Sequence, residues 1–287
     1  MLQSLKELVS ERVKTELTDL IIRPWESYRL DWYSNTDNLG DILNPILVNA
    51  LTGKKIVQVA AKRYRKPHYF VIGSILSRAT KHTTVWGSGF ISSDARCIEK
   101  PAQVCAVRGP KTRDSLLAQG IQCPEVYGDP ALLLPKIFLP KAQKQYKIGV
   151  IPHYVDKNQP SLQKILQDPE VKLIDIQDPN PYNFIMQMLS CEKIISSSLH
   201  GIIIADAYGI PSLWGEFTNK VAGDGFKFLD YFASVKRSDN SPIDLAEVND
   251  FRGIVSKFNR YQVEFDIEKL LEACPFELDL QIPYIER

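Results

Sequence analysis

The fold of this chain is constrained most by residues 193–214, KIISSSLHGIIIADAYGIPSLW. A β-branched strand pattern ends in a short turn of serines, and an apolar helix pattern follows, closed by Gly209 and Pro211. A strand that ends in a tight turn and continues into a helix is half of a βαβ unit. His200 therefore stands at a helix N-terminus, where free N–H groups favour an anion. A structural role for this histidine and a role in a site are evenly balanced, because ligands of open α/β sheets bind outside the carboxyl ends of the strands.

The same alternation of strand and helix runs through both halves of the chain. Other strands are expected at residues 28–33, 57–60, 69–72, 83–86, 103–107, 147–151, 171–176 and 211–214, and other helices at 2–18, 42–51, 110–120, 161–167, 182–189, 243–258 and 265–273, with a short aromatic helix within 221–237. Residues 135–147 have little periodicity and two prolines, as an exposed linker does. This pattern predicts two α/β domains with parallel sheets whose ligand edges face one cleft. We expect an N-terminal amphipathic helix in 1–22, a first domain in 23–140 and a second domain with a helical tail in 141–287.

Composition excludes several classes of protein. The 35 Lys and Arg residues balance the 34 Asp and Glu residues, so no overall field draws in nucleic acid or an anionic membrane. The five cysteines form no CxxC pair, which argues against a disulfide framework or a zinc site, and we expect no metal. The first twenty residues lack the apolar core of a signal peptide, and no stretch approaches the roughly 20 apolar residues that span a bilayer. We expect a cytoplasmic protein, with peripheral contact to a membrane-bound substrate left open.

A second strand-turn-helix junction lies at SNTDNLGDILNP, residues 34–45. Asn38 and Asp41 stand near its mouth, and Gly40 permits a close backbone approach. Capping of the following helix is an equally good explanation for Asp37, Asn38 or Asp41. Pro45 is expected near the first turn, so the helix should begin only a few residues before it.

Glycines and cations follow other predicted strands. Residues 87–90, GSGF, resemble a phosphate loop only loosely, because they lack both the dinucleotide spacing and the lysine of a P-loop. Arg108 and Arg113 fall where a strand ends and a helix begins, and a cation there needs a compensating anion. A structural salt bridge or a bound phosphate or carboxylate would serve equally. Asp129 also follows a strand, where capping and an inter-domain contact are the alternatives.

The second half contributes two more candidates. His153 follows the strand expected at residues 147–151, so it should reach the same rim as His200, opposite Arg108 and Asp41. Lys227 is a candidate anion ligand, although an exposed lysine is the simpler interpretation.

Six motifs taken together are similar to those of the polysaccharide pyruvyl transferase family, and the resemblance covers roughly residues 30–235. They are NLGDILNP at 38–45, GSGF at 87–90, RGPKT at 108–112, GDPALLLP at 128–135, IPHY at 151–154 and SSSLHGIIIADAYGIPSLW at 196–214. The resemblance implies two Rossmann-like domains in a glycosyltransferase-B-like arrangement. It also implies transfer of a pyruvyl group from phosphoenolpyruvate onto two hydroxyls of a sugar as a cyclic ketal.

The resemblance also implies which residues form the site. The family's Leu-His signature falls on Leu199 and His200, its Asn-Gly-Asp turn on Asn38, Gly40 and Asp41, and its arginine after the central strand on Arg108. Several family members have Arg before the Leu-His pair where this chain has Ser198, so Lys227, Arg113 or backbone N–H groups must supply that donor contact, or the donor differs. The expected donor contacts are Arg108, Arg113, Ser197, Ser198, Leu199, Gly201 and Lys227, and the expected acceptor contacts are Asn38, Gly40, Gly87, Ser88, Gly89 and His153.

We therefore expect a pyruvyl transferase acting on a surface polysaccharide or a lipid-linked precursor, with phosphoenolpyruvate as a substrate and no separate cofactor. His200 would shuttle a proton between donor and sugar because imidazole titrates near neutrality, Asp41 would activate or orient a hydroxyl, and Arg108 would bind the donor. A nucleotide-sugar-dependent glycosyltransferase is the main alternative, since the expected architecture serves both. A non-catalytic carbohydrate-binding protein is the third.

Overall fold

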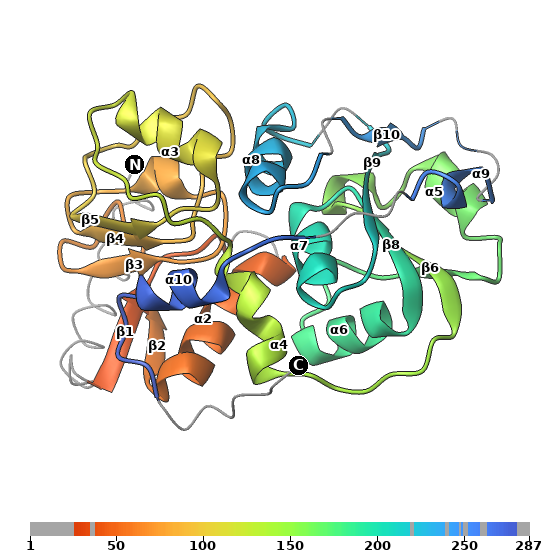
Figure 1. The fold of residues 1–287 in the computed structure, drawn as a ribbon, viewed down its shortest axis with the longest axis horizontal. Helices are drawn as coiled ribbons and strands as arrows, with labels where there is room; N and C mark the ends of the chain where they lie inside the picture. Colours follow the sequence, from red (N-terminus) through yellow and green to blue (C-terminus); the bar gives the residue numbers. More distant parts are fainter. Residues whose placement is uncertain are drawn as a thin grey trace, which may run out of the picture.

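The computed structural model describes residues 26–34, 38–218, 221–238, 241–246, 248, 252–258 and 263–279. The expected helix over residues 2–18 and the possible cap Asp37 lie outside these residues. Within them the chain forms two α/β domains, each built on a sheet of five parallel strands (Figure 1). The prediction of two α/β domains with parallel sheets is thereby confirmed, while the glycosyltransferase-B-like arrangement stays a prediction.

The first domain contains the sheet with strand order β2-β1-β3-β4-β5. Its elements are β1 (Ser27–Leu30), α2 (Leu39–Thr52), β2 (Lys55–Gln58), β3 (His68–Phe70), η2 (Leu76–Arg78), β4 (Thr83–Trp86), β5 (Gln103–Ala106), α3 (Pro110–Leu117), η3 (Pro130–Leu133) and α4 (Leu134–Ile137). The last of these is a single helical turn that overlaps the start of residues 135–147, which were expected to form an exposed linker.

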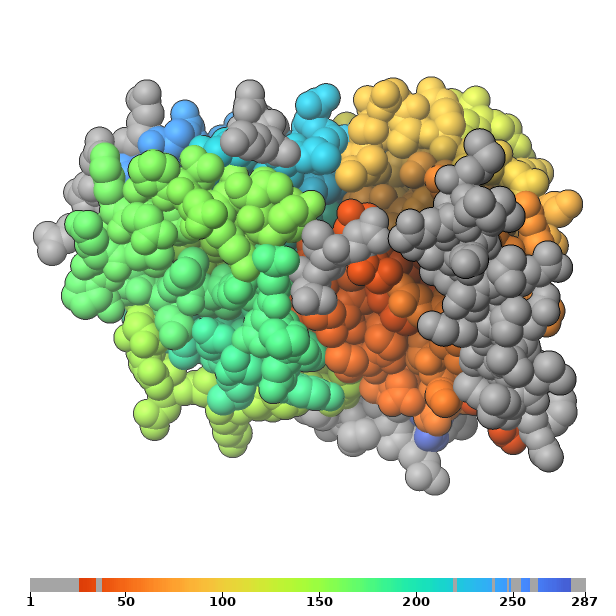
Figure 2. All heavy atoms as spheres, turned by 180° about the vertical axis from the view of Figure 1, so that it is seen from behind, coloured from red at the N-terminus to blue at the C-terminus, as the bar shows by residue number. Residues whose placement is uncertain are grey.

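The second domain contains the sheet with strand order β10-β9-β8-β6-β7. Its elements are β6 (Tyr146–Ile151), η4 (Tyr154–Asp156), α5 (Pro160–Ile165), β7 (Val171–Leu173), α6 (Pro181–Leu189), β8 (Cys191–Ser196), α7 (Leu199–Ala207), β9 (Ser212–Glu216), α8 (Phe226–Ser234), β10 (Ile243–Asp244) and α9 (Arg252–Val255). Viewed from behind, the two halves of the chain lie side by side (Figure 2), and α8 packs against α3 of the first domain.

Both sheets have the same strand order. Numbered within each domain along the chain, both run 2-1-3-4-5, the order of flavodoxin-like doubly wound sheets. In this order the chain turns to opposite sides of the sheet after strands 1 and 3, which opens a crevice outside their carboxyl ends. The topology therefore predicts one ligand-binding edge after β1 and β3 and another after β6 and β8.

Helix α2 begins earlier than its proline suggests. It starts at Leu39, and Pro45 lies inside it rather than in its first turn. The proline has no N–H to give the carbonyl of Asp41, but the side-chain amide of Asn44 donates to that carbonyl at 3.3 Å. Asn44 also exchanges hydrogen bonds with both backbone groups of Ile72, just beyond β3. This side chain therefore fixes the start of α2 against the carboxyl edge of the first sheet.

Helix α7 is buried along almost its whole length. It packs on β8 and β9 of its own domain and on η3 of the first domain. This double packing explains its apolar sequence on every face, since a helix covered on all sides has no polar stripe. A Cβ at Gly201 would lie 2.3 Å from the hydroxyl oxygen of Ser196, so glycine is what lets the first turn of α7 lie close to β8. The helix is thus held rigidly between the two domains.

The C-terminal segment that we expected to belong to the second domain packs instead on the first. Helix α10 (Ile267–Glu272) lies over the first sheet (Figure 1), where the indole N–H of Trp86 donates to the carbonyl of Leu270 at 2.9 Å. Phe276 contacts the rings of Tyr28 and Tyr69. The chain therefore joins its two domains a second time.

The prediction of one helix over residues 243–258 is wrong. Residues Ile243 and Asp244 instead form β10, a parallel partner of β9, and only Arg252–Val255 are helical. Leu245 then packs against Gly215 of β9. Pairing with an available sheet edge therefore overrides the helical pattern of the sequence.

Within the described residues, no helix is both long and apolar enough to cross a membrane.

Candidate active site

The carboxyl edges of the two sheets meet at the starts of α2 and α7. A Cβ at Gly40, in the first turn of α2, would lie 2.1 Å from both Cε1 and Nδ1 of His200, so the imidazole rests directly on the glycine backbone. The N–H of Leu39 donates across the same junction to the carbonyl of Ile176 at 2.9 Å. Gly40, expected as an acceptor contact, therefore admits the His200 ring.

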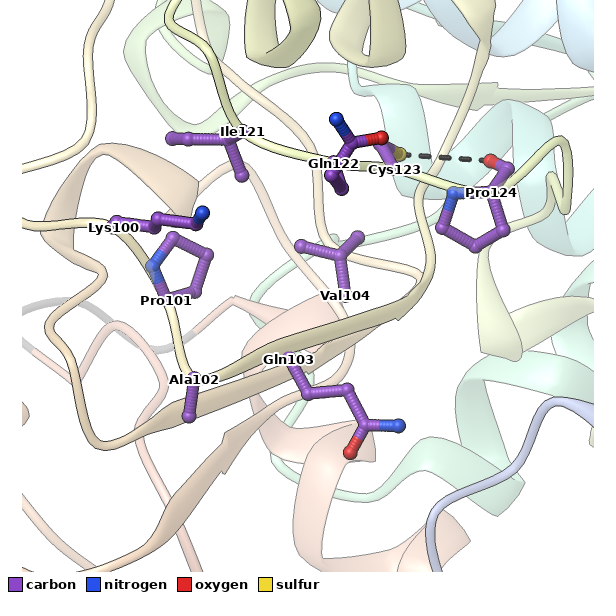
Figure 3. A pocket seen from close by; sticks show the side chains of 9 residues that line it. All are labelled: Lys100, Pro101, Ala102, Gln103, Val104, Ile121, Gln122, Cys123 and Pro124. Atoms are coloured by element: carbon purple, nitrogen blue, oxygen red, sulfur yellow. Dashed lines mark hydrogen bonds between the residues drawn. The ribbon is translucent and has the colours of Figure 1, made fainter.

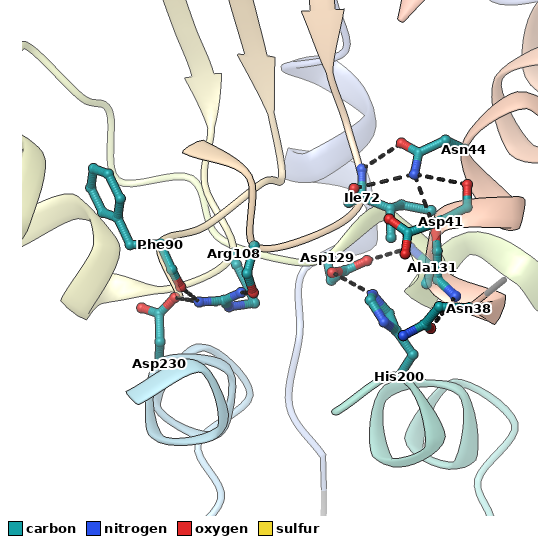
Figure 4. A network of polar contacts seen from close by, with 12 residues as sticks. Asn38, Asp41, Asn44, Ile72, Phe90, Arg108, Asp129, Ala131, His200 and Asp230 are labelled. Atoms are coloured by element: carbon teal, nitrogen blue, oxygen red, sulfur yellow. Dashed lines mark hydrogen bonds and ion pairs between the residues drawn. The ribbon is translucent and has the colours of Figure 1, made fainter. Parts of the chain in front are cut away.

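His200 is mostly buried and has an unused nitrogen. Its side chain is 13% exposed, and Nε2 lies 3.8 Å from Oδ2 of Asp129 (Figure 4), too far for a hydrogen bond. Burial, followed by the cations Lys227 and Arg108, lowers the pKa of His200 to about 3. The expectation that this imidazole titrates near neutrality is wrong, because the desolvated ring stays neutral at pH 7.

Asp129, for which the sequence predicts a cap or an inter-domain contact, is a component of the site that was not among the expected site residues. Oδ1 accepts the Ala131 N–H at 3.0 Å and caps η3, while Oδ2 faces His200. Both alternatives for this residue, a cap and an inter-domain contact, therefore hold at once. Burial raises the pKa of Asp129 to about 7, against a smaller opposing effect of the Ala131 N–H and of Arg108.

Asp41, like Asp129, lies on the first-domain side of the same junction, opposite His200 (Figure 4). Its Oδ1 accepts the Tyr33 N–H at 3.1 Å, which ties the segment after β1 to α2. Burial raises the pKa of Asp41 to about 7. The helix is capped by Asn38 instead, whose side chain accepts the Gly40 N–H at 3.2 Å. Asn38 thus takes the capping role, and Asp41 remains a carboxyl that titrates near neutrality.

Arg108 belongs to a buried inter-domain ion pair. Its side chain is 1% exposed, and Nε donates to Oδ2 of Asp230, on α8, at 3.0 Å. The two terminal nitrogens donate to the Ser74 hydroxyl and the Phe90 carbonyl. Asp230 also accepts from the N–H and hydroxyl of Thr112 in the first turn of α3. Two compensating anions were considered for Arg108, a carboxylate of the protein and a bound ligand. The structure supplies the first, the carboxylate of Asp230 in a salt bridge.

Arg113 likewise has other partners. Its Nε donates to the Cys123 carbonyl at 3.1 Å, and its terminal nitrogen pairs with Glu125 at 3.2 Å. These partners lie on the segment that follows α3. The structure thus does not bring Arg113 to the junction of α2 and α7.

Lys227, at the start of α8, is the cation that the site leaves available. Its ammonium lies 5.6 Å from the ring centroid of Phe228 and makes no hydrogen bond or ion pair within the described residues. Burial and the nearby Arg108 lower the pKa of Lys227 to about 8, with Glu216 opposing them. The charge of Lys227 also lowers the pKa values of His153 and His200. Lys227 is therefore a half-buried cation beside two neutral imidazoles.

The edge of the second sheet is shaped by His153 and Ser197. The Ser197 hydroxyl accepts the His153 N–H at 2.7 Å and donates to buried Asp156 at 2.8 Å. Nδ1 of His153 faces the Val155 N–H at 3.5 Å, and burial lowers the pKa of this imidazole to about 4. The Ser197 hydroxyl therefore holds the loop after β6 through these two hydrogen bonds. His153 is a neutral ring at the carboxyl edge of the second sheet.

The turn before α7 supplies backbone rather than side chains. Leu199 is a core residue, Gly201 allows close helix packing, and Ser198 is the N-cap residue although its hydroxyl forms no capping bond. The N–H groups of Ser198 and Gly201 already donate to the Ser196 hydroxyl and the Ser198 carbonyl, which leaves those of Leu199 and His200 in the first turn. They are the donors that this turn can offer to an anion.

The glycine-rich loop after β4 serves packing in two of its three positions. A Cβ at Gly87, where φ is +95°, would meet Pro130 at 2.1 Å, and one at Gly89 would meet the Arg108 guanidinium at 2.5 Å. Between them, Ser88 is fully buried and its hydroxyl has no hydrogen-bond partner. Ser88 alone of this loop keeps an unused polar group.

A cavity of about 460 Å³ lies at the opposite, amino end of β5 (Figure 3). Its lining includes Lys100, Val104, Ile121 and Cys123, and none of the candidate residues. Burial raises the pKa of the Cys123 thiol to about 12, so the thiol is not ionised at neutral pH. Within the described residues, no group of three or more His, Cys, Asp or Glu side chains is placed to hold a metal ion.

Comparisons with known proteins bear on this geometry. The family model of the polysaccharide pyruvyl transferases matches residues 4–214, which include Asp41, Asp129 and His200 but not Lys227. Uncharacterized protein L143 of Acanthamoeba polyphaga mimivirus is 37% identical over 203 residues, 68% of this chain and 70% of that protein. Succinoglycan biosynthesis protein ExoV of Rhizobium meliloti (strain 1021) is 28% identical over 211 residues, 70% of this chain and 62% of ExoV. No solved structure matches this chain significantly.

Proposed function

Because this chain belongs to the polysaccharide pyruvyl transferase family, we propose that it moves the pyruvyl group of phosphoenolpyruvate onto two hydroxyls of one sugar, forming a cyclic ketal. The acceptor would be a sugar of a surface polysaccharide or of its lipid-linked precursor. The printed name of ExoV, a succinoglycan biosynthesis protein, supports this class of acceptor. We place the protein in the cytoplasm, in peripheral contact with a membrane when the acceptor is lipid-linked.

The observation that carries the proposal is the available ammonium of Lys227 beside His200. Phosphoenolpyruvate has a phosphate and a carboxylate, so its site needs a cation and N–H donors. Ser198 stands where several family members have an arginine, and Arg108 and Arg113 are paired elsewhere. Lys227 and the first-turn N–H groups of α7 are the donors that remain for the anion.

The side chains at the junction include groups for the acid–base steps of ketal formation. Neutral His200 accepts a proton from an attacking sugar hydroxyl, and its imidazolium returns that proton to the departing phosphate. Asp41 accepts a hydrogen bond from a hydroxyl and orients it, on the first-domain side of the junction. His153 lies at the rim with its pKa lowered, where it is a neutral hydrogen-bonding group for the sugar.

The test is phosphate release by the purified protein from phosphoenolpyruvate offered with a panel of galactosides, mannosides and glucosides. His200→Ala should slow release by about 10²–10⁴-fold, and Lys227→Ala should weaken donor binding. Lys111→Ala is the matched control for the lysine, because Lys111 is exposed on α3.

Thermal shift separates the proposal from its alternatives. Stabilisation by phosphoenolpyruvate, and not by nucleotide sugars, is the expected result. Stabilisation by a nucleotide sugar alone would indicate a glycosyltransferase instead. Sugar binding without phosphate release, when both substrates are present, would indicate a carbohydrate-binding protein.

A further inference from the structure

Asp129 and His200 present two unused polar atoms to the same space. Oδ1 of Asp129 is occupied by the Ala131 N–H, which leaves Oδ2 pointing across the domain junction. Nε2 of His200, on the other domain, is buried and has no hydrogen-bond partner. At 3.8 Å the two atoms do not bond to each other, but both lie within reach of one ligand atom placed about 3 Å from each. The carboxylate of Asp129 and the ring of His200 therefore face each other across the domain junction (Figure 4).

We propose that Asp129 is the catalytic acid that protonates the methylene carbon of the donor, an inference that rests on the proposed pyruvyl transfer. The protonated carboxyl gives its proton to that carbon, the carbon–carbon double bond becomes a methyl group, and positive charge develops at the central carbon. Among the described residues at this junction, Asp129 is the carboxyl residue that faces His200. Its carboxyl group is held in place by the hydrogen bond with which it caps η3.

The protons of the two sugar hydroxyls are also accounted for. The first sugar hydroxyl attacks the central carbon and loses its proton to His200, which passes it to the bridging oxygen as the carbon–oxygen bond to phosphate breaks. The second hydroxyl then attacks the same carbon and gives its proton to the Asp129 carboxylate. Donor and diol become ketal and inorganic phosphate, and both side chains return to their starting states.

The surroundings of Asp129 favour its neutral form. Gly128, beside it, packs against apolar Leu270 of α10, while α7 presents neutral His200 and α2 presents Asp41. Arg108 is the charged neighbour that opposes protonation, and its charge is already paired with Asp230. The carboxyl is consequently half-protonated near neutrality, with its pKa raised to about 7 by burial. An acid with this pKa is well matched to a cytoplasmic reaction.

Asp129→Asn is the decisive variant, because its amide oxygen still accepts the Ala131 N–H and keeps the cap. We expect phosphate release to fall by about 10²–10⁴-fold, with the affinity for phosphoenolpyruvate, measured by calorimetry, unchanged. In the wild type the rate should fall as pH rises through about 7, since the acid must be protonated. This fall in rate with rising pH should be absent from the residual activity of Asp129→Asn and present in Asp129→Glu. Asp114→Asn, at an exposed position on α3, is the control.

An infrared difference spectrum between wild type and Asp129→Asn needs no turnover. A protonated carboxyl band that disappears as pH rises through about 7 is the expected result. A wild-type rate in Asp129→Asn, or no such band below pH 7, would overturn the role of Asp129. A wild-type protein that shows the band and releases no phosphate with any acceptor would instead overturn the proposed function and, with it, this step.

Discussion

Replacing Gly40 by alanine tests whether the His200 ring really rests on the start of α2. The added Cβ would lie 2.1 Å from two ring atoms, and its three nearest heavy atoms all belong to His200. Carbon atoms in contact are normally about 3.5–4.0 Å apart. The imidazole would thus have to move by about 1.5 Å, away from the position where Nε2 faces Asp129.

The expected size of the effect follows from two opposing contributions. Overpacking of this kind costs about 1–3 kcal/mol, while alanine in place of glycine in a helix contributes up to about 1 kcal/mol. Gly40→Ala should therefore lower the free energy of unfolding by about 1–2 kcal/mol. A catalytic group displaced by about 1 Å costs on the order of 100-fold in rate, so phosphate release should fall at least that far.

Urea denaturation in two backgrounds checks this reasoning. In His200→Ala the obstructing ring is absent, so the same Gly40→Ala change should be neutral or stabilising by up to about 1 kcal/mol. Equal destabilisation in both backgrounds would refute the contact. Gly209→Ala is the control, because φ is +67° there and a Cβ would meet nothing within 4 Å. Gly209→Ala should lower the free energy of unfolding by about 1–2 kcal/mol through backbone strain alone. This variant should leave activity unchanged.

Three further outcomes are expected. Lys227→Gln should weaken phosphoenolpyruvate binding by about 10–100-fold in calorimetry, and wild-type affinity should fall as pH rises through about 8, since only the ammonium attracts the anion; affinity that is flat with pH would contradict this. Asp230→Ala should cost about 3–5 kcal/mol in urea unfolding, because buried Arg108 loses its counter-charge; a change below about 1 kcal/mol would contradict the buried pair. The pKa of Asp41 is raised from 3.8 to about 7 in the folded protein, so the native state binds more protons than the unfolded state between these values and the wild type loses stability as pH rises through them. Asp41→Asn, which cannot ionise, should therefore be more stable relative to wild type at pH 8 than at pH 4; an equal difference at both pH values would contradict this.

Much of the fold could be predicted from the sequence because its signals are local. β-branched runs followed by turns and apolar helical stripes mark most of the strands and helices, and Asn38 and Gly53 mark the two ends of α2. Prediction failed where a distant partner decides the structure. Residues 243–258 carry a helical pattern, but Ile243 pairs with Gly215 of β9. Their neighbour in the sheet, not their own periodicity, fixes their conformation.

The candidate site divides in the same way. His200, His153 and Asp41 could be placed because each follows a strand, and strand ends gather at one edge of a parallel sheet. The role of Arg108 could not be predicted, because its partner Asp230 lies 122 residues further along the chain. Lys227, the less favoured cation in the sequence, has no such partner within the described residues and so remains for an anion.

Asp129 shows why a local signal can be correct and still incomplete. The sequence Gly-Asp-Pro predicts a cap, and Oδ1 makes that cap, but a carboxyl has a second oxygen whose use depends on the docking of the other domain. The facing atoms of Asp129 and His200 exist only while the domains are held together, in part by the buried Arg108–Asp230 pair. Arg108 thus contributes to the site by holding the two domains together. A variant that weakens this pair should lower the rate by separating the acid from the base, even when every residue facing the substrate is intact.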